Sequence, residues 1–268
     1  MDSSSHDNMS FLEHLEELRW HIIRSLIAII SAGFICFLMK DFIFDTIIFG
    51  PKKMDFPTYK FLCQAATFIG VETTFCGDEF PFIVQNRTMA GQFSAHVMTS
   101  IISGFIISFP YILYEFWKFI SPGLLEKEKA KSRGFIFVSS MLFFIGVLFG
   151  YYIISPLSIN FLGTYQVSSQ VLNEIDLGSF ISLVRSSALA SGIIFELPII
   201  IYFLTKAGVV TPESLVKYRK YALVLVLVLA AIITPPDVAS QIIVAIPIVI
   251  LYQVSIFISR IVVKNQNK

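Results

Sequence analysis

The chain has 268 residues, of which 55% are hydrophobic and 15% are charged, and its formal net charge is +1. Its mean hydropathy is +0.75, whereas soluble domains carry roughly a quarter charged residues. This composition excludes a soluble globular domain, and the small net charge excludes a strongly basic protein that binds nucleic acid. We expect an integral protein of the lipid bilayer that forms one membrane domain over residues 1–268.

The apolar stretches, taken in chain order, predict an all-α membrane protein with six transmembrane helices. A helix needs about 20 residues to cross the hydrocarbon core of a bilayer. Stretches that approach this length fall at 22–42, 96–117, 134–157, 181–206, 221–234 and 239–259. The fifth stretch is short, so it is expected to tilt less, to thin the bilayer locally or to shelter behind other helices. A long polar loop at 43–95 separates the first two spans.

The positions of lysine and arginine predict that both termini are cytoplasmic. These residues fill the connections at 118–133 and 207–220, whereas the connections at 158–180 and 235–238 contain none. Cytoplasmic loops carry the excess of lysine and arginine, and long loops such as 43–95 are translocated largely regardless of their charge. We therefore expect 43–95, 158–180 and 235–238 to lie outside.

Two of the three cysteines lie in the long external loop. Cys63 and Cys76 would meet an oxidising compartment there, and a bridge between them would contribute about 3 kcal/mol of local order. The spacing alone leaves both the paired and the unpaired state open, because it does not show how close the two Cα atoms come. Cys36 lies within the first span, where it is expected to be a small buried apolar residue.

A helix is expected to begin just before the first span, where Ser10 and Glu13 form the S-x-x-E pattern of a capping box. Its periodicity makes the helix amphipathic. The apolar face holds Phe11, Leu15, Leu18 and Ile22, and the polar face holds Glu13, Glu17 and Arg24. Periodicity alone predicts that these glutamates form a solvated acidic face.

The fourth span contains a carboxylate followed by a helix-breaking residue, Glu196 and Pro198. An ionisable residue within a span costs roughly 2.5–3.5 kcal/mol on insertion scales and marks a functional site or a water-filled cavity. A buried structural carboxyl is the alternative. Prolines also interrupt the second and sixth spans at Pro110 and Pro247. Because proline tends to kink a helix, the three helices can curve around a shared concave surface.

Four motifs occur in order among the six spans. They are H-L-x-E-L-R at 14–19, F-I-S-P-G-L-x-x-x-E at 119–128, F-E-L-P at 195–198 and T-P-P-D-V-x-S-Q at 234–241. In these motifs the chain resembles the TatC family, the multispanning receptor subunit of the twin-arginine protein translocase. The resemblance runs from about Phe11 to about Arg260 and is weakest in the long external loop. It implies a glove-like arrangement of helices in the bacterial cytoplasmic (inner) membrane.

The resemblance implies a receptor that is not an enzyme and needs no cofactor or metal. Such a receptor binds the twin-arginine signal peptides of folded proteins, recruits single-span subunits of the TatA/TatB type, and associates with further copies of itself. Export is driven by the proton-motive force. The family's signal-peptide site matches Glu17 and Glu128, with Arg19 expected to orient the acidic cluster. Two carboxylates suit two arginines, because a guanidinium presents a planar fork that a carboxylate accepts bidentately.

The remaining motif residues match a second site and a set of turns. By resemblance, Glu196 contacts a polar residue of a partner's transmembrane helix, with Pro198 bending the span and Gln241 nearby. The residues that match structural turns of the family are Pro51, Pro235, Pro236 and Asp237. Asp237 is equally suited to be the N-cap of the last span.

Two other classes of membrane protein compete with the receptor. A proton-coupled secondary transporter would use Glu196 as its proton carrier. Against it, the sequence shows six spans, no evident inverted repeat and one clearly intramembrane carboxylate. An intramembrane enzyme would need a motif such as HExxH or G-x-S-x-G, which the sequence lacks, and its four histidines are not at metal-ligand spacing.

Overall fold

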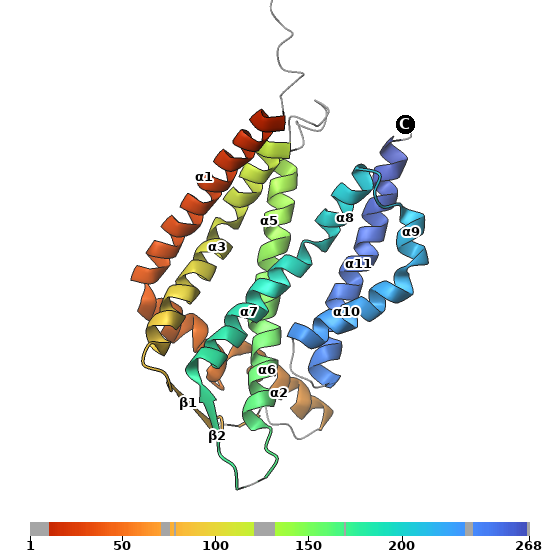
Figure 1. Ribbon diagram of the computed structural model, residues 1–268. Helices are drawn as coiled ribbons and strands as arrows, with labels where there is room; N and C mark the ends of the chain where they lie inside the picture. The colour runs from red at the N-terminus through yellow and green to blue at the C-terminus, as the bar shows by residue number, and fades with distance from the viewer. Residues whose placement is uncertain are drawn as a thin grey trace, which may run out of the picture. The chain divides into compact units, whose positions relative to one another are not determined.

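The computed structural model describes residues 11–70, 76–77, 79–120, 132–168, 170–233 and 238–266, and Figure 1 shows its ribbon. The α-helices are α1 (Phe11–Leu38), α2 (Pro57–Ile69), α3 (Gly91–Ile120), α5 (Ser132–Phe149), α6 (Ser155–Thr164), α7 (Leu177–Phe195), α8 (Leu197–Lys206), α9 (Pro212–Lys217), α10 (Arg219–Ile233) and α11 (Val238–Gln266). Three short helical segments are η1 (Phe42–Ile48), η2 (Gly50–Lys52) and η5 (Gly150–Ile154), and the strands are β1 (Phe82–Gln85) and β2 (Asn173–Asp176).

Five helical segments of the described chain are long and apolar enough to cross a membrane. They are His14–Leu38, Gly91–Ile120, Gly134–Thr164, Leu177–Lys206 and Gln241–Asn265. The chain is therefore a multi-pass helical membrane protein. The predicted span at 221–234 corresponds to α10, whose 15 residues fall short of the length that a full crossing needs. The count of six spans stays a prediction.

The chain divides into two compact units. The first contains residues 1–39 and 97–141, and the second contains residues 40–96 and 142–268. The expectation of one membrane domain stays a prediction.

In the first unit, α1 and α3 lie side by side (Figure 1) and pack through glycine. A Cβ atom added at Gly104 would lie 2.5 Å from the backbone nitrogen of Gly33, so a larger residue would force the helices apart. Nearby, the Ser108 hydroxyl donates a hydrogen bond of 3.0 Å to the carbonyl of Ala28. Small residues and interhelical hydrogen bonds are what joins helices in lipid, where apolar side chains gain little by leaving the bilayer.

In the second unit, close packing joins the end of α5 and η5 to α7. A Cβ atom at Gly146 would lie 2.6 Å from the carbonyl oxygen of Ser191. The buried core of this unit is built by apolar side chains of η5, α10 and α11, namely Ile154, Val226, Ala230, Val244, Ala245 and Ile248. The short α10 therefore packs on α11 through one side, while Val224, Leu225 and Val228 on α10 are at least half exposed. The expected shelter behind other helices stays a prediction.

The fourth span is interrupted at Glu196, as the following proline predicts. Helix α7 ends at Phe195 and α8 begins at Leu197, with Pro198 in the first turn of α8. Proline has no N–H to continue the ladder of α7. In contrast, Pro110 and Pro247 lie inside the unbroken helices α3 and α11. These two prolines do not end their helices, because a single proline can be accommodated within a membrane helix. The predicted kinks around a shared concave surface stay a prediction.

The predicted external loops contain secondary structure that the sequence analysis does not predict. Strand β1 pairs in parallel with β2, with Phe82 opposite Asn173. Arg87 and Glu174 add an exposed ion pair of 2.9 Å beside the strands. The all-α prediction is thus correct for the spans and wrong for this small sheet. Because β1 belongs to the loop 43–95 and β2 to the loop 158–180, these two loops meet at one end of the second unit.

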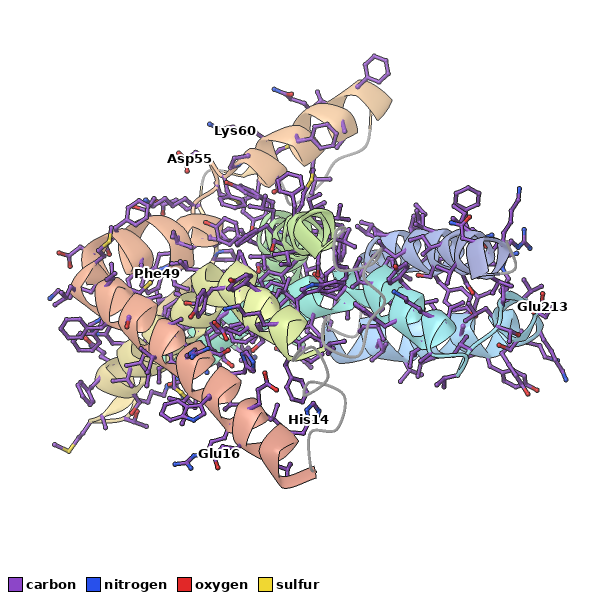
Figure 2. All side chains as sticks on the ribbon, turned by 90° about the horizontal axis from the view of Figure 1, so that it is seen from above. His14, Glu16, Phe49, Asp55, Lys60 and Glu213 are labelled. Carbon is purple, nitrogen blue, oxygen red and sulfur yellow. A yellow bond between two sulfur atoms is a disulfide. The ribbon has the colours of Figure 1, made fainter. Side chains whose placement is uncertain are left out.

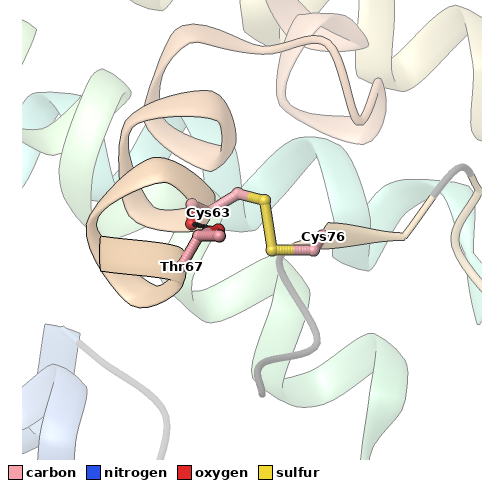
Figure 3. Close-up of a disulfide and its surroundings, with 3 residues drawn as sticks. All are labelled: Cys63, Thr67 and Cys76. Atoms are coloured by element: carbon pink, nitrogen blue, oxygen red, sulfur yellow. Dashed lines mark hydrogen bonds between the residues drawn. A yellow bond between two sulfur atoms is a disulfide. The ribbon is translucent and has the colours of Figure 1, made fainter. Parts of the chain in front are cut away.

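The long loop is anchored by a fully buried tyrosine and closed by a disulfide. The hydroxyl of Tyr59 lies 2.9 Å from each of the carbonyl oxygens of Pro51 and Pro156. Its burial raises the pKa of this phenol. Cys63 and Cys76 form a disulfide with their Cα atoms 5.1 Å apart, as Figure 3 shows.

Candidate functional site

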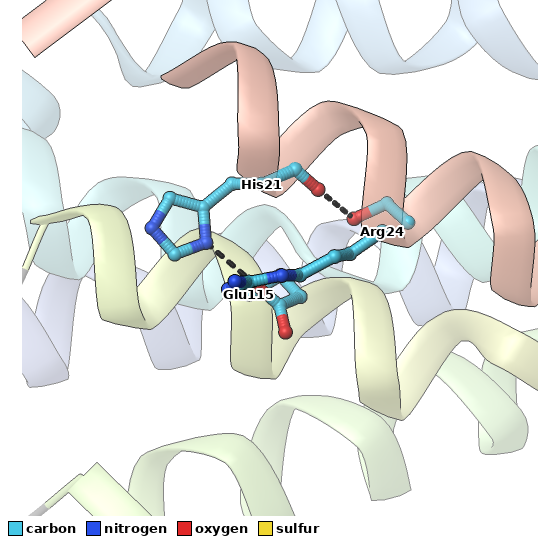
Figure 4. Close-up of polar contacts among 4 residues, drawn as sticks. His21, Arg24 and Glu115 are labelled. Carbon is cyan, nitrogen blue, oxygen red and sulfur yellow. Dashed lines mark hydrogen bonds and ion pairs between the residues drawn. The ribbon is translucent and has the colours of Figure 1, made fainter. Parts of the chain in front are cut away.

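A cluster of ionisable residues around the buried Glu115 joins α1 to α3 in the first unit (Figure 4). The carboxylate of Glu115, on α3, is 3% exposed, and its Oε2 lies 2.6 Å from Nδ1 of His21 on α1. Nη1 of Arg24 lies 3.8 Å from the same oxygen. The Tyr111 hydroxyl, one helical turn before Glu115, is also hydrogen-bonded to the carboxylate. Glu115 is thus a buried acid surrounded by donors from two helices.

Helical spacing places an aromatic ring beside this cluster. Phe119 lies one turn after Glu115 on α3, and positions four apart share one face of a helix. Its ring centroid is 4.5 Å from that of His14 and 6.1 Å from that of His21. The motif at 14–19 therefore packs directly against the start of the motif at 119–128.

Glu17 lies on the same side of α1 as His21, one turn earlier. Its Oε2 is buried and accepts no hydrogen bond from the residues that the structure describes. By contrast, Leu15 and Ile22 are 45% and 50% exposed. The predicted solvated acidic face does not fully include Glu17, because one oxygen of its carboxylate is buried. In a membrane protein the apolar side chains can face lipid, while polar groups turn toward neighbouring helices.

Arg19 lies outside the buried cluster. Its Nη1 is 3.5 Å from Oε1 of Glu16, and both side chains are more than 60% exposed. Such exposed pairs contribute little to stability. The structure therefore places Arg19 beside Glu16 and does not bring it to Glu17. Glu128 lies outside the described residues, as do Pro235, Pro236 and Asp237.

Glu196 of the second predicted site is 8% exposed and caps the end of α7. Gln241 uses its amide inside the hairpin of α10 and α11, where Nε2 donates a 3.1 Å hydrogen bond to the carbonyl of Leu227. Pro51 is buried, and its carbonyl accepts from Tyr59. Contacts of Glu196, Pro198 or Gln241 with a partner helix stay a prediction.

Glu115 and His21 are not among the functional residues that the sequence predicts. The prediction that Glu196 is the one clearly intramembrane carboxylate is wrong, because Glu115 lies within the second span and is also buried. The signal was available, since an acid inside a predicted span is itself notable. Among the described residues, no group of three or more His, Cys, Asp or Glu side chains is arranged to hold a metal ion.

These features define a multi-pass helical membrane protein that holds ionisable side chains between its helices. A family model described as "Sec-independent protein translocase protein (TatC)" matches residues 13–247. The chain therefore belongs to the TatC family, and this confirms the resemblance seen in its four motifs. Members of the family are components of a protein translocase.

TatC proteins of other organisms match this chain over nearly its whole length. The TatC protein of Blattabacterium sp. subsp. Periplaneta americana (strain BPLAN) is 47% identical over 97% of this chain and 98% of its own. That of Aquifex aeolicus (strain VF5) is 35% identical, with the same shares covered. A crystal structure described as the twin-arginine translocase receptor TatC has a TM-score of 0.68 and 34% identity, covering 94% of this chain and all of its own. A second, in the detergent DDM, has a TM-score of 0.71 and 35% identity, covering 92% and 99%.

Proposed function

We propose that the chain is the receptor subunit of a twin-arginine translocase and binds the twin-arginine signal peptides of folded proteins. Family membership and the two receptor structures support this function. The chain then works as a binding protein within a transport complex driven by the proton-motive force. Family membership favours this function over a proton-coupled secondary transporter that uses Glu196.

The observation that carries the proposal is the environment of Glu17. One oxygen of its carboxylate is turned into the protein and lacks a donor among the described residues, and a buried acceptor without a donor is costly. A guanidinium from a signal peptide would supply charged donors in a planar fork. By the family pattern, Glu128 would bind the second arginine of the signal peptide. His21 and Arg24 lie 2.6 and 3.8 Å from Glu115, so another carboxylate already engages these two neighbouring side chains.

Partner subunits are proposed to bind at the break of the fourth span. Glu196 lies where α7 ends, and Pro198 opens the helix there. A carboxyl held at such a break can exchange hydrogen bonds with a polar residue of a single-span TatA/TatB-type helix. Further copies of the same chain would complete the complex.

The proposed topology places six helices in the bacterial inner membrane in a glove-like arrangement, with both termini cytoplasmic. Support comes from the lysine and arginine pattern and from the pairing of β1 with β2. That pairing requires the loops 43–95 and 158–180 to share one side of the membrane. The short α10, which packs on α11, would be the fifth span.

The test is binding of the purified protein to an Arg-Arg signal peptide and to its Lys-Lys twin, by fluorescence anisotropy. Glu17→Gln and Glu128→Gln should each weaken Arg-Arg binding at least about tenfold, because a charge-assisted bond is worth roughly 1.5–3 kcal/mol. Glu16→Gln is the matched control, since Glu16 is the adjacent glutamate and is 63% exposed. Equal binding of both peptides in all variants would refute the receptor assignment.

A further inference from the structure

A positively charged groove lies between α9 and the end of α11 in the second unit. Its volume is about 640 Å³, and its lining includes Glu213, Val216, Lys217, Arg260 and Lys264. Three cationic side chains and one carboxylate leave it with a net positive charge. The proposed signal-peptide and partner sites, at Glu17, Glu128 and Glu196, do not include this groove. Figure 2 labels Glu213, which marks the α9 side.

The groove is built on a fixed support. Leu215 of α9 is buried against Tyr252 and Ile256 of α11. The Tyr252 hydroxyl donates a 2.8 Å hydrogen bond to the carbonyl of Leu215, and a capping box formed by Thr211 and Ser214 closes the start of α9. The spacing between α9 and α11 is therefore set by buried contacts and not by the charged side chains themselves.

The groove continues into an exposed apolar surface along α11. Arg260 and Lys264 are four residues apart and share one face of the helix. One turn before Arg260, Phe257 is 64% exposed, and further exposed apolar side chains of α11 follow toward its middle, namely Ile250 and Val254. At the groove itself, Val216 is 46% exposed. A charged recess therefore opens at the end of an exposed apolar surface.

We propose that this groove binds the phosphate headgroup of an anionic phospholipid, whose acyl chains lie along α11. Arginine and lysine together suit a phosphate, because arginine supplies a bidentate fork and lysine a point charge. Basic pockets between membrane helices are sites of this kind for anionic headgroups. A free phosphate would match the charges but leave the exposed Phe257 surface unused, so a lipid fits the groove better than a soluble anion does.

The test is native mass spectrometry of the purified protein in a neutral detergent, titrated with phosphatidylglycerol, phosphatidylcholine or soluble glycerophosphate. Arg260→Gln/Lys264→Gln should lower phosphatidylglycerol binding about tenfold or more, because each cation near a membrane surface contributes to anionic-lipid affinity. Arg219→Gln/Lys220→Gln is the matched control. It also removes one arginine and one lysine, but from α10 and outside the groove.

The proposal expects tight phosphatidylglycerol binding in the wild type and in the control, and weak binding in the groove variant. Equal losses in both variants would show that lipid binding depends on the total positive charge and not on the groove, and would overturn the site. Glycerophosphate that binds as tightly as the lipid would also overturn it, in favour of a soluble anion. Thermal unfolding in phosphatidylcholine should match in all three proteins, which shows that they fold. Arg-Arg peptide binding should persist in the groove variant, so this test is independent of the receptor function.

Discussion

His21 and Glu115 join α1 to α3 through a 2.6 Å contact between Nδ1 and Oε2, although 94 residues separate them in the chain. Both side chains are nearly buried, at 11% and 3% exposure. Removing one partner of a buried hydrogen bond leaves the other unsatisfied and costs about 1–3 kcal/mol, more where a charged group is involved. The pair is therefore expected to determine how firmly the two motif-bearing helices are held together.

Glu115→Ala should lower the thermal unfolding midpoint of the purified protein markedly, because it leaves His21 and Arg24 facing a void. Glu16→Ala is the control, since the exposed pair of Glu16 with Arg19 should contribute no more than about 1 kcal/mol. The measurement is thermal unfolding in detergent. Similar midpoints for the two variants would show that the buried pair contributes no more to stability than the exposed pair.

The glycine contact between α1 and α3 gives a second prediction. A Cβ atom at Gly104 would lie 2.5 Å from the backbone nitrogen of Gly33, whereas one at Gly134 on α5 meets nothing within 4 Å. Gly104→Ala should therefore destabilise the protein by about 1–3 kcal/mol, the usual cost of overpacking. Gly134→Ala should be neutral or slightly stabilising, because alanine favours a helix. Unfolding midpoints that fall equally would contradict the packing argument.

These contacts show where sequence reasoning succeeds and where it stops. The spans and the family motifs are local patterns of hydropathy and residue type, so the chain order reveals them. The break at Glu196 is local too, because Pro198 removes a donor two residues later. The pairing of His21 with Glu115 and the register of β1 on β2 depend on how distant segments meet. Nothing in the sequence around Glu115 indicates which residue of α1 faces it.

The first helix shows a similar limit. Periodicity places Leu15 and Ile22 on one face, but it does not say whether that face meets lipid or other helices. In lipid the apolar side is free to face outward, and the buried positions are those with polar or small side chains, such as His21 and Gly33. Periodicity therefore separates the two faces, and which of them is buried depends on the helix that lies alongside.

Tyr59 is expected to hold the external loop at neutral pH and to release it in alkali. Tyr59→Phe removes the hydrogen bonds to the carbonyls of Pro51 and Pro156 and should cost about 1–3 kcal/mol. Tyr165→Phe, at an exposed tyrosine, is the control. Hydrogen exchange of α2 amides should increase in the first variant alone.

The pH dependence follows from the same burial. Burial raises the pKa of Tyr59 above the ordinary tyrosine value of about 10. A group whose pKa is raised by folding contributes stability that is full below the unfolded value and is lost as the pH rises toward the folded one. The wild type should therefore lose α2 protection above about pH 10. Tyr59→Phe should lack that alkaline step, and its persistence in the variant would assign it to another group.

Counting reactive thiols can test the disulfide between Cys63 and Cys76. The chain has three cysteines, of which Cys36 is free and buried while Cys63 and Cys76 are bonded. Protein isolated from an oxidising compartment and unfolded without reductant should react with one equivalent of thiol reagent, and with three after reduction. Reduction should also destabilise the loop by about 3 kcal/mol, the value for closing a loop of this size. Three reactive thiols without reductant would show that the bond does not form.

A substitution at Glu196 should weaken partner binding without weakening signal-peptide binding. Glu196→Ala removes a carboxyl that is 8% exposed at the break between α7 and α8, so it should reduce co-purification of a TatB-type single-span subunit. It should leave the affinity for an Arg-Arg peptide within about twofold, because the proposed peptide site uses Glu17 and Glu128. Glu196→Gln keeps the size and the hydrogen-bonding capacity, and it should retain partner binding if a neutral hydrogen bond is what the site supplies. Loss in both variants would instead require the ionised carboxylate. A loss of peptide binding with partner binding intact would contradict the division of roles between the two sites.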